Sequence, residues 1–284
     1  MGAVRVTVVS DTHLSDRAPG SLENWRAVAA HVERDRPAAV VHAGDLTFDA
    51  ASDPGELAAA RRMLGGLGVP WVAVPGNHDI GDNPGTSAPL VTTEWLERWV
   101  SELGADRFSL DLGRWTLLGV DAQLFGSGLA AEEDQWRWLD REVAALVEGR
   151  PIGLVVHKPL WAGPGGRESD APSRFVPPPA RRRLDDRRRR RPMPLVVSGH
   201  VHQYRELSDD RSLHAWAPTA WAVLPDERQP TIGLKRCGLL SLLLDDDGTA
   251  RVELVEPEGI AQQVLGLDVD DPYAHESGGL GVRP

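Results

Sequence analysis

Short runs of β-branched and apolar residues recur along the 284-residue chain, and polar residues follow them closely. Runs of this length and composition are typical of strands that are buried on both faces of a parallel sheet. Five of these runs precede the candidate chemistry described below and occupy residues 4–9, 38–41, 71–74, 152–156 and 195–197.

Amphipathic segments separate the strand-like runs of the first half. The pattern predicts a helix at 22–34 with Ser21 as its N-cap, and further helices at 56–67, 92–103 and 132–147. Gly113-Arg114 separates two runs at 107–112 and 115–120, which favours a hairpin. This alternation of strand and helix predicts an α/β fold built on a parallel sheet.

The second half changes character after Gln203. Short strands are predicted at 204–207, 213–216, 238–244 and 250–255, and we expect all of them to extend a second, mixed sheet. Patterning is weak from about Glu258 onward. We therefore expect residues 1–257 to form one domain and residues 258–284 a loosely held tail.

Side chains that can bind metal ions follow each of the five buried runs. In open α/β sheets, ligands bind beyond the carboxyl ends of the strands. Five of the nine histidines lie in these places, together with aspartate and asparagine, and such a set without thiolate suits Mn, Fe, Zn or Co. The segments are Asp11-Thr12-His13, Gly44-Asp45, Gly76-Asn77-His78-Asp79, His157 and Gly199-His200-Val201-His202.

Each segment has an ordinary interpretation when it is taken alone. Gly44-Asp45 is a common turn dipeptide, and His157 could be a hydrogen-bonded core residue. His200 and His202 would point to opposite faces of a strand, so they converge only around a bent turn. Taken jointly, the segments favour a site for a pair of divalent metal ions.

The ordered set DxH, GD, GNHD, H and GHxH resembles the calcineurin-like metallophosphoesterase superfamily. The resemblance covers residues 4 to about 255 and implies a four-layer α/β/β/α sandwich with two mixed sheets and two metal ions. It implies that Asp45 bridges the metals, that Asp11, His13 and His202 bind the first, and that Asn77, His157 and His200 bind the second.

The residues beside the ligands are given other roles. In the family, the histidine that matches His78 faces the phosphate, so hydrogen bonding to phosphoryl oxygens or general acid action is expected of it. Asp79 is expected to orient His78 or a ligand. Two metals that clamp a phosphoryl group lower the pKa of a bridging water, and the resulting hydroxide attacks phosphorus.

The spacing between these motifs and the residues around Asn77 are similar to those of the cyclic-nucleotide phosphodiesterase branch, which includes glycerophosphodiesterase-like members. We therefore expect hydrolysis of small-molecule phosphodiesters, with 3',5'-cyclic nucleotides as candidate substrates and Mn or Fe favoured over Zn or Co. The alternatives are a phosphomonoesterase or a nuclease with the same site, or a non-catalytic regulatory or scaffold protein that the metals stabilise.

The segment after His157 departs from that branch, in which a second histidine and paired prolines are common. Lys158 here is expected to be an exposed loop residue, with a phosphate contact as the alternative. Residues 159–179 form a long Gly/Pro-rich loop, a length that is often functional. We consider a lid over the site that is formed by Trp161 and Gly163-Pro164-Gly165-Gly166, with Trp161 stacking on a base.

Composition limits the kinds of binding partner and cellular location that we expect for this protein. A net charge of −11 argues against general nucleic-acid coating, and the single Cys237 excludes an internal disulfide. No apolar run reaches the roughly 20 residues of a membrane span, so a cytoplasmic protein without membrane contact is expected. Residues 181–191 hold eight arginines and two aspartates, for which a solvated basic helix is favoured over a polyanion patch. The sequence leaves a homodimer open.

Overall fold

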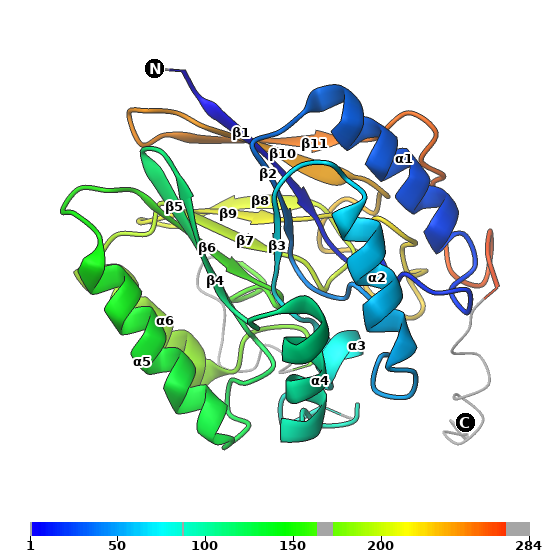
Figure 1. Cartoon of the computed structure of the whole chain (residues 1–284), viewed down its shortest axis with the longest axis horizontal. Helices are drawn as coiled ribbons and strands as arrows, with labels where there is room; N and C mark the ends of the chain where they lie inside the picture. The colour runs from blue at the N-terminus through cyan, green and yellow to red at the C-terminus, as the bar shows by residue number, and fades with distance from the viewer. Residues whose placement is uncertain (1, 87, 164–172, 271–284) are drawn as a thin grey trace.

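Two β-sheets form the centre of the molecule in a computed structural model that describes residues 2–86, 88–163 and 173–270 (Figure 1). The first sheet has the order β11-β10-β1-β2-β3 and the second β4-β5-β6-β7-β9-β8. The strands of the first sheet are β1 (Val4–Val9), β2 (Ala39–His42), β3 (Trp71–Ala73), β10 (Leu239–Leu244) and β11 (Ala250–Val255). Those of the second are β4 (Phe108–Leu112), β5 (Trp115–Val120), β6 (Ile152–Val156), β7 (Leu195–Ser198), β8 (Arg205–Ser208) and β9 (Leu213–Trp216).

The apolar runs form parallel strands, as expected, in the middle of the second sheet and from the centre to one edge of the first. β1, β2 and β3 are parallel, and so are β5, β6, β7 and β9. One expectation is wrong: β10 and β11 do not extend the second sheet. Instead, β10 pairs antiparallel with β1, with Val4 opposite Leu244, and β11 pairs with β10.

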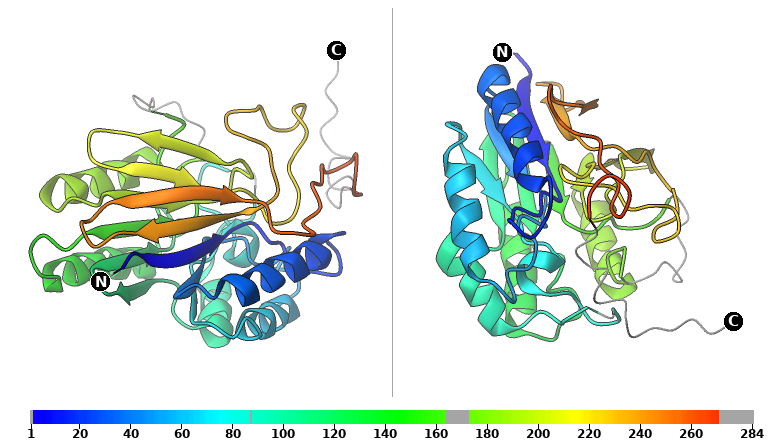
Figure 2. Two further views of the ribbon diagram at one scale, coloured as in Figure 1. Left: turned by 90° about the horizontal axis from the view of Figure 1, so that it is seen from above. Right: turned by 90° about the vertical axis from the view of Figure 1, so that its right-hand side faces the viewer.

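Helices cover the outer face of each sheet, so the fold is the expected four-layer α/β/β/α sandwich (Figures 1 and 2). Val40 packs outward against the helices while its neighbour Val41 packs between the sheets, because successive strand residues point to opposite faces. The first sheet is covered by α1 (Ser21–Asp35), α2 (Gly55–Gly65) and α4 (Thr93–Leu103), and the second by α5 (Ala130–Ala145) and α6 (Pro178–Arg190). The short α3 (Asn77–Ile80) follows β3.

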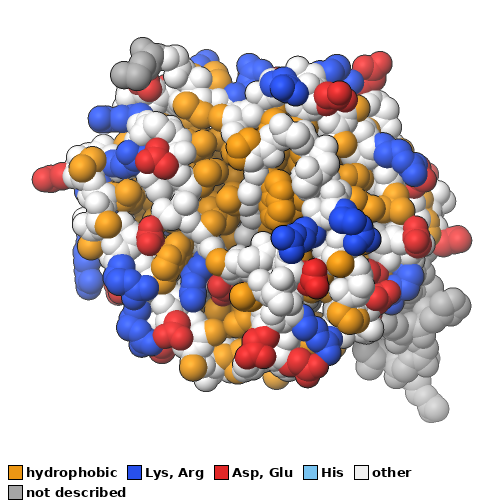
Figure 3. All heavy atoms as spheres, in the orientation of Figure 1, with side chains coloured by type: hydrophobic (Ala, Val, Ile, Leu, Met, Phe, Trp, Pro, Cys, Tyr) orange, Lys and Arg blue, Asp and Glu red, His pale blue; other side chains and the backbone are white. Residues whose placement is uncertain are grey.

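The arginine-rich segment forms α6, and its side chains hold this helix against α5. Arg183 binds Glu133 and Arg187 binds Asp140, each through two hydrogen bonds, and both guanidinium groups lie over the ring of Trp136. Blue and red side chains lie close to one another over α5, at the lower left of Figure 3. The segment is therefore the expected basic helix, but it is not simply solvated, because its arginines pack it against α5 and Arg188 is buried.

Two local expectations need correction or qualification. Helix α1 begins at Ser21 itself, and Gly20 with φ 78° is its N-cap. Within the expected tail, the Ala261 amide donates to Asn24 at 2.8 Å, and Leu265 is buried. The division of the chain at residue 257 stays a prediction, and residues 271–284 lie outside the described part. No helix among the described residues combines the length and apolar character of a membrane span.

Candidate metal centre

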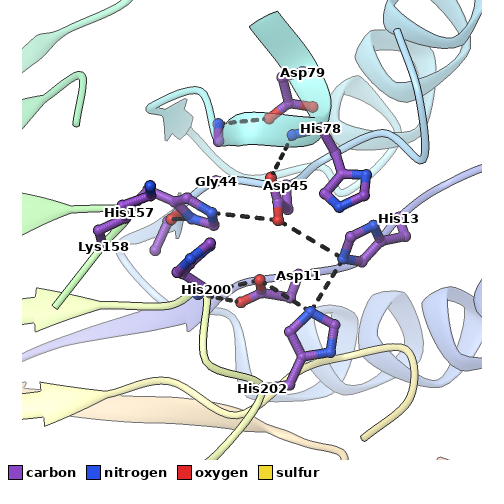
Figure 4. A network of polar contacts seen from close by, with 12 residues as sticks. Asp11, His13, Gly44, Asp45, His78, Asp79, His157, Lys158, His200 and His202 are labelled. Carbon is purple, nitrogen blue, oxygen red and sulfur yellow. Dashed lines mark hydrogen bonds and ion pairs between the residues drawn. The ribbon is translucent and has the colours of Figure 1, made fainter. Parts of the chain in front are cut away.

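The seven expected ligands come together at one edge of the sandwich. Figure 4 shows all of them except Asn77 as labelled side chains. Asp11 and His13 follow β1, Asp45 follows β2, and Asn77 begins α3 directly after β3. The second sheet contributes from its own parallel strands, with His157 after β6 and with His200 and His202 after β7. Loops at the carboxyl ends of five parallel strands thus supply the whole set.

Four side chains form the first donor set. One ligand atom each of Asp11, His13, Asp45 and His202 lies within 4.8 Å of the others. His13 Nε2 is 3.2 Å from His202 Nε2, which in turn is 3.4 Å from Asp11 Oδ1. Two imidazole nitrogens that face one another beside carboxylates fit a shared cation.

A second donor set shares Asp45 with the first. Asp45, His157 and His200 meet the same 4.8 Å criterion, and His157 Nε2 is 3.3 Å from Asp45 Oδ2. Asn77 lines the adjoining cavity, where its buried Oδ1 has no hydrogen-bond partner among the described residues. His200 Nδ1 is likewise buried without a hydrogen-bond partner among the described residues. Unsatisfied buried donors and acceptors of this kind fit a second metal ion.

Backbone carbonyl groups fix the orientation of three of these imidazoles. His157 Nδ1 is 2.7 Å from the Ala43 oxygen, and His202 Nδ1 is 2.7 Å from the Ala222 oxygen. His200 uses its other nitrogen, with Nε2 2.6 Å from the Ser173 oxygen. In the neutral form of each ring the nitrogen at the carbonyl carries the proton, and the remaining lone pair faces the donor sets, as metal binding requires.

The ligand loops carry unusual backbone conformations. Outside glycine, six described residues have positive φ, and five of them are expected ligands: Asp11, His13, Asp45, His200 and His202, with φ from 45° to 69°. Such conformations cost about 1–3 kcal/mol each and persist where the surrounding structure enforces them. The bent turn required for His200 and His202 to converge is therefore present.

Two glycines allow the loops to approach one another. Gly44 has φ 103°, and a Cβ atom there would lie 2.3 Å from His157 Nδ1. A Cβ atom on Gly76 would lie 2.2 Å from Asp45 Oδ1. A side chain at Gly44 would displace His157, and a side chain at Gly76 would displace Asp45.

His78 and Asp79 have separate surroundings. The His78 amide donates to Asp45 Oδ1 at 2.9 Å, and its Nδ1 is 2.7 Å from the Phe48 oxygen, so Nε2 is directed toward the cavity that His78 lines. Asp79 is buried behind this loop. It accepts hydrogen bonds from the Leu46, Thr47 and Gly76 amides and from Thr47 Oγ1 at 2.7–3.1 Å. Asp79 thus holds the loop of Asp45 rather than the ring of His78.

Burial and mutual contact shift the pKa values of the cluster. Burial would raise the pKa of Asp45, but His157 and His78 lower it well below its ordinary value. Burial would likewise lower the pKa of His157, yet Asp45 raises it to about 9. Burial lowers the pKa values of His13 and His200, which favours neutral imidazoles that can act as ligands.

A cavity of about 190 Å³ opens over the donor sets. Its wall beyond the ligands is mostly apolar, with Arg174 as the one described Lys or Arg side chain that lines it. Sequence reasoning missed this wall, because its residues come from separate loops without a motif. They are Arg174, Trp221, Leu224, Gln229 and Leu265.

Two expectations for the segment after His157 are wrong. Lys158 is fully buried, with Nζ 2.6 Å from Asp82 Oδ1, so it is neither exposed nor directed at a phosphate. Trp161 packs on His214 with ring centroids 4.0 Å apart and lines a different cavity from that of the ligands. Residues 164–166 of the proposed lid lie outside the described part, which omits residues 164–172.

Comparison with known proteins decides the family. The model of the calcineurin-like phosphoesterase family matches residues 4–204. The chain belongs to this family. It is therefore related to phosphoester hydrolases that use two metal ions, and the two donor sets that share Asp45 are the candidate metal site of this calcineurin-like phosphoesterase.

Individual relatives are distant. The phosphoesterase is 30% identical over 131 residues to the glycerophosphodiester phosphodiesterase GpdQ of Enterobacter lignolyticus, which covers 44% of this chain and 43% of that protein. The chain spans less than two thirds of the curated relatives it matches. Two solved structures share its fold with a TM-score of 0.61 each. Purple acid phosphatase PPD1 of yellow lupin (Lupinus luteus) is 15% identical, with 92% of this chain and 52% of that chain covered. A dimetal phosphatase of Danio rerio is 13% identical, with 89% and 96% covered.

Proposed function

We propose that this protein is a dinuclear-metal phosphodiesterase that hydrolyses small phosphodiesters. The observation that carries the proposal is the pair of donor sets that share Asp45 beneath a cavity bordered by His78. Asp11, His13 and His202 would hold one metal ion, and Asn77, His157 and His200 the other. Two bound metal ions would supply the positive charge that binds a phosphoryl group and makes a water molecule acidic near neutral pH.

The protein's own residues would orient the ester in this cavity. The Phe48 carbonyl fixes the His78 ring, and Asp45 fixes its backbone. Since Nδ1 donates to that carbonyl, His78 would act as an imidazolium, whose Nε2 would donate a hydrogen bond to a phosphoryl oxygen or a proton to the departing alkoxide. Asp79 would act indirectly, since it holds the loop that carries Asp45.

The cavity wall favours a diester over a monoester. A phosphomonoester carries close to two negative charges at neutral pH, and a diester carries one and has a second alcohol group to accommodate. Arg174 is the single Lys or Arg among the described lining residues, while Trp221, Leu224 and Leu265 offer apolar surface to that alcohol. The resemblance to GpdQ points in the same direction.

Size favours compact alcohol groups. The cavity of about 190 Å³ is smaller than the roughly 300–1,000 Å³ of pockets that enclose drug-sized ligands. Glycerophosphodiesters therefore fit the proposal better than 3',5'-cyclic nucleotides, which lose the proposed base contact because Trp161 lies elsewhere. Mn and Fe remain the favoured metals, although availability decides metal identity as much as the ligands do.

The test compares bis-p-nitrophenyl phosphate with p-nitrophenyl phosphate after reconstitution with Mn²⁺. We expect faster hydrolysis of the diester, and a glycerophosphodiester should be cleaved faster than a cyclic nucleotide. Hydrolysis of neither chromogenic substrate by protein with bound Mn²⁺ would contradict the assignment as an enzyme. Preference for the monoester would contradict the assignment as a diesterase.

Two variants separate metal binding from catalysis in the same assay. Asn77→Ala should lose affinity for one of two Mn²⁺ ions, since it removes a proposed ligand. His78→Ala should bind both ions and lose roughly 10²–10⁴-fold in kcat, the range for removal of a general acid. Equal loss of metal in both variants would contradict the separate role of His78.

A further inference from the structure

A buried polar cluster lies behind the proposed metal centre and surrounds the amino group of Lys158. Lys158 Nζ donates to Asp82 Oδ1 at 2.6 Å and to Asn83 Oδ1 at 2.8 Å. Asp82 Oδ1 also accepts the Asn83 amide at 2.7 Å. All three side chains are at most 5% exposed. The cluster joins the end of β6 to the loop that follows α3.

Gln123 connects this cluster to the proposed ligand Asn77. In the orientation of its side-chain amide that satisfies both ends, Gln123 donates to Asp82 Oδ1 at 2.9 Å and accepts from the backbone N–H of Asn77 at 3.1 Å. Gln123 is fully buried, and its own backbone amide donates to Asp121 Oδ1 at 2.7 Å. A continuous path of hydrogen bonds therefore runs from Lys158 through Asp82 and Gln123 to Asn77.

Both ends of this path reach the second donor set. Lys158 directly follows His157, which carries a ligand nitrogen of that set (Figure 4). Asn77 lies at the other end of the path, and its buried Oδ1 has no hydrogen-bond partner in the described structure. In contrast, no hydrogen bond of the described structure links the cluster to Asp11, His13 or His202 of the first set.

We propose that Lys158, Asp82 and Gln123 are positioning residues for the second metal ion, an inference that rests on the proposed function. The ion pair fixes the end of β6 relative to the α3–α4 loop, and Gln123 transmits that geometry to Asn77. His157 and Asn77 are thereby held at one separation before metal binds. Asp11, His13 and His202 of the first donor set make no hydrogen bond to this cluster in the described structure, so the cluster acts on the second set more directly than on the first.

The energetics of buried ion pairs favour a positioning role over a purely stabilising one. Removal of two charges from water costs several kcal/mol per ion, and well-packed apolar side chains often give equal or greater stability. What the pair supplies is a fixed direction for each of its hydrogen bonds. Residues that orient metal ligands in this way typically affect metal affinity by 10–100-fold.

The experiment measures Mn²⁺ binding by titration calorimetry of the metal-free protein. Gln123→Met removes the link to Asn77 at nearly constant volume, and a double variant, Lys158→Met with Asp82→Asn, removes both charges so that neither is stranded. Gln135→Met is the control for loss of a buried amide beside the path: among the described residues its side chain bonds to the Asp121 backbone and not to Asp82, Gln123 or Asn77. Arg188→Met with Asp209→Asn is the control for loss of a buried ion pair remote from the metals.

The wild type and both controls should bind two ions. Gln123→Met and the double variant should weaken one ion by about tenfold or more and leave the other within about threefold. Thermal unfolding of the metal-free proteins identifies variants that fail to fold. If either Gln123→Met or the double variant fails to fold, the Mn²⁺ affinities of the other one decide the test. Two unchanged affinities in a folded variant would overturn the positioning role alone. Fewer than two ions in the wild type would overturn the proposed function and this inference with it.

Discussion

Removal of the Asp79 carboxylate should destabilise the protein and weaken metal binding while it leaves the chemical step largely intact. Asp79 does not line the cavity, and its two oxygens accept four hydrogen bonds from Leu46, Thr47 and Gly76. Three of the donors are backbone amides of the loops that carry Asp45 and Asn77. A residue with these contacts acts on the ligand loops, so stability and metal affinity should report its loss.

The magnitude follows from the amides that Asp79→Ala leaves behind. A buried donor without a partner costs about 1–3 kcal/mol. Three such amides would cost about 3–9 kcal/mol, and a water molecule in the vacated space would reduce the loss toward the lower end, about 3–5 kcal/mol. That loss is a large part of the roughly 5–15 kcal/mol typical of a folded domain, so the variant should fold but with clearly reduced stability.

Urea unfolding of the metal-free protein measures the first effect, with exposed Asp16→Ala as the control. Calorimetric titration with Mn²⁺ should then show weaker binding in Asp79→Ala. At saturating Mn²⁺, kcat for bis-p-nitrophenyl phosphate should stay within about tenfold of the wild type. A hundredfold loss of kcat at saturating metal, with unchanged stability, would refute the reasoning and place Asp79 at the substrate.

Three further predictions concern the surroundings of the site. Arg174→Ala should raise KM for bis-p-nitrophenyl phosphate and lower kcat/KM by about tenfold with Mn²⁺ affinity unchanged, whereas unchanged kinetics would show that Arg174 does not contact the diester. Trp161→Ala should leave KM and kcat unchanged, since the ring packs on His214, and a rise in KM would restore the lid hypothesis. Burial and Arg188 lower the pKa of His214 from its ordinary 6.5 to about 4, so the unfolded chain binds this proton first as the pH falls. In urea unfolding, the stability that wild type has relative to His214→Gln should therefore shrink by up to about 3 kcal/mol between pH 7 and pH 4, and a constant difference would contradict that role.

Local patterns predicted much of the fold because parallel strands and their polar ends leave local signals. Apolar runs identified β1, β5, β6, β7 and the other buried strands, and the residues after them identified the side chains that the structure brings together. The placement of β10 had no such signal. Its pairing with β1 joins residues far apart in the chain, and an apolar strand suits the edge of either parallel core equally well.

Side-chain environments were the least predictable part. A lysine in a loop after a strand is usually exposed. Lys158 is buried because a separate loop brings the Asp82 carboxylate and Asn83 Oδ1 to its amino group. Trp161 is only four residues after His157 in the sequence. Its ring nevertheless packs on the His214 ring of β9 and lines another cavity. Arg174 reaches the site from the far end of a loop whose path no local pattern defines. Each case depends on a contact between segments distant in sequence.

The strained ligand residues show why these tertiary contacts matter for function. Asp11 and His202 have φ of 52°, and His200 has φ of 69°, conformations that their own local preferences disfavour. Hydrogen bonds between loops compensate for this strain: both oxygens of Asp11 accept the His200 amide, and the Ala222 carbonyl accepts from the His202 ring. Since these bonds form only when β1 and β7 are already aligned, the ligand geometry is a product of the assembled sandwich. The residue types that bind metal are readable from the sequence, but the backbone that aims them is set by the contact between the two sheets.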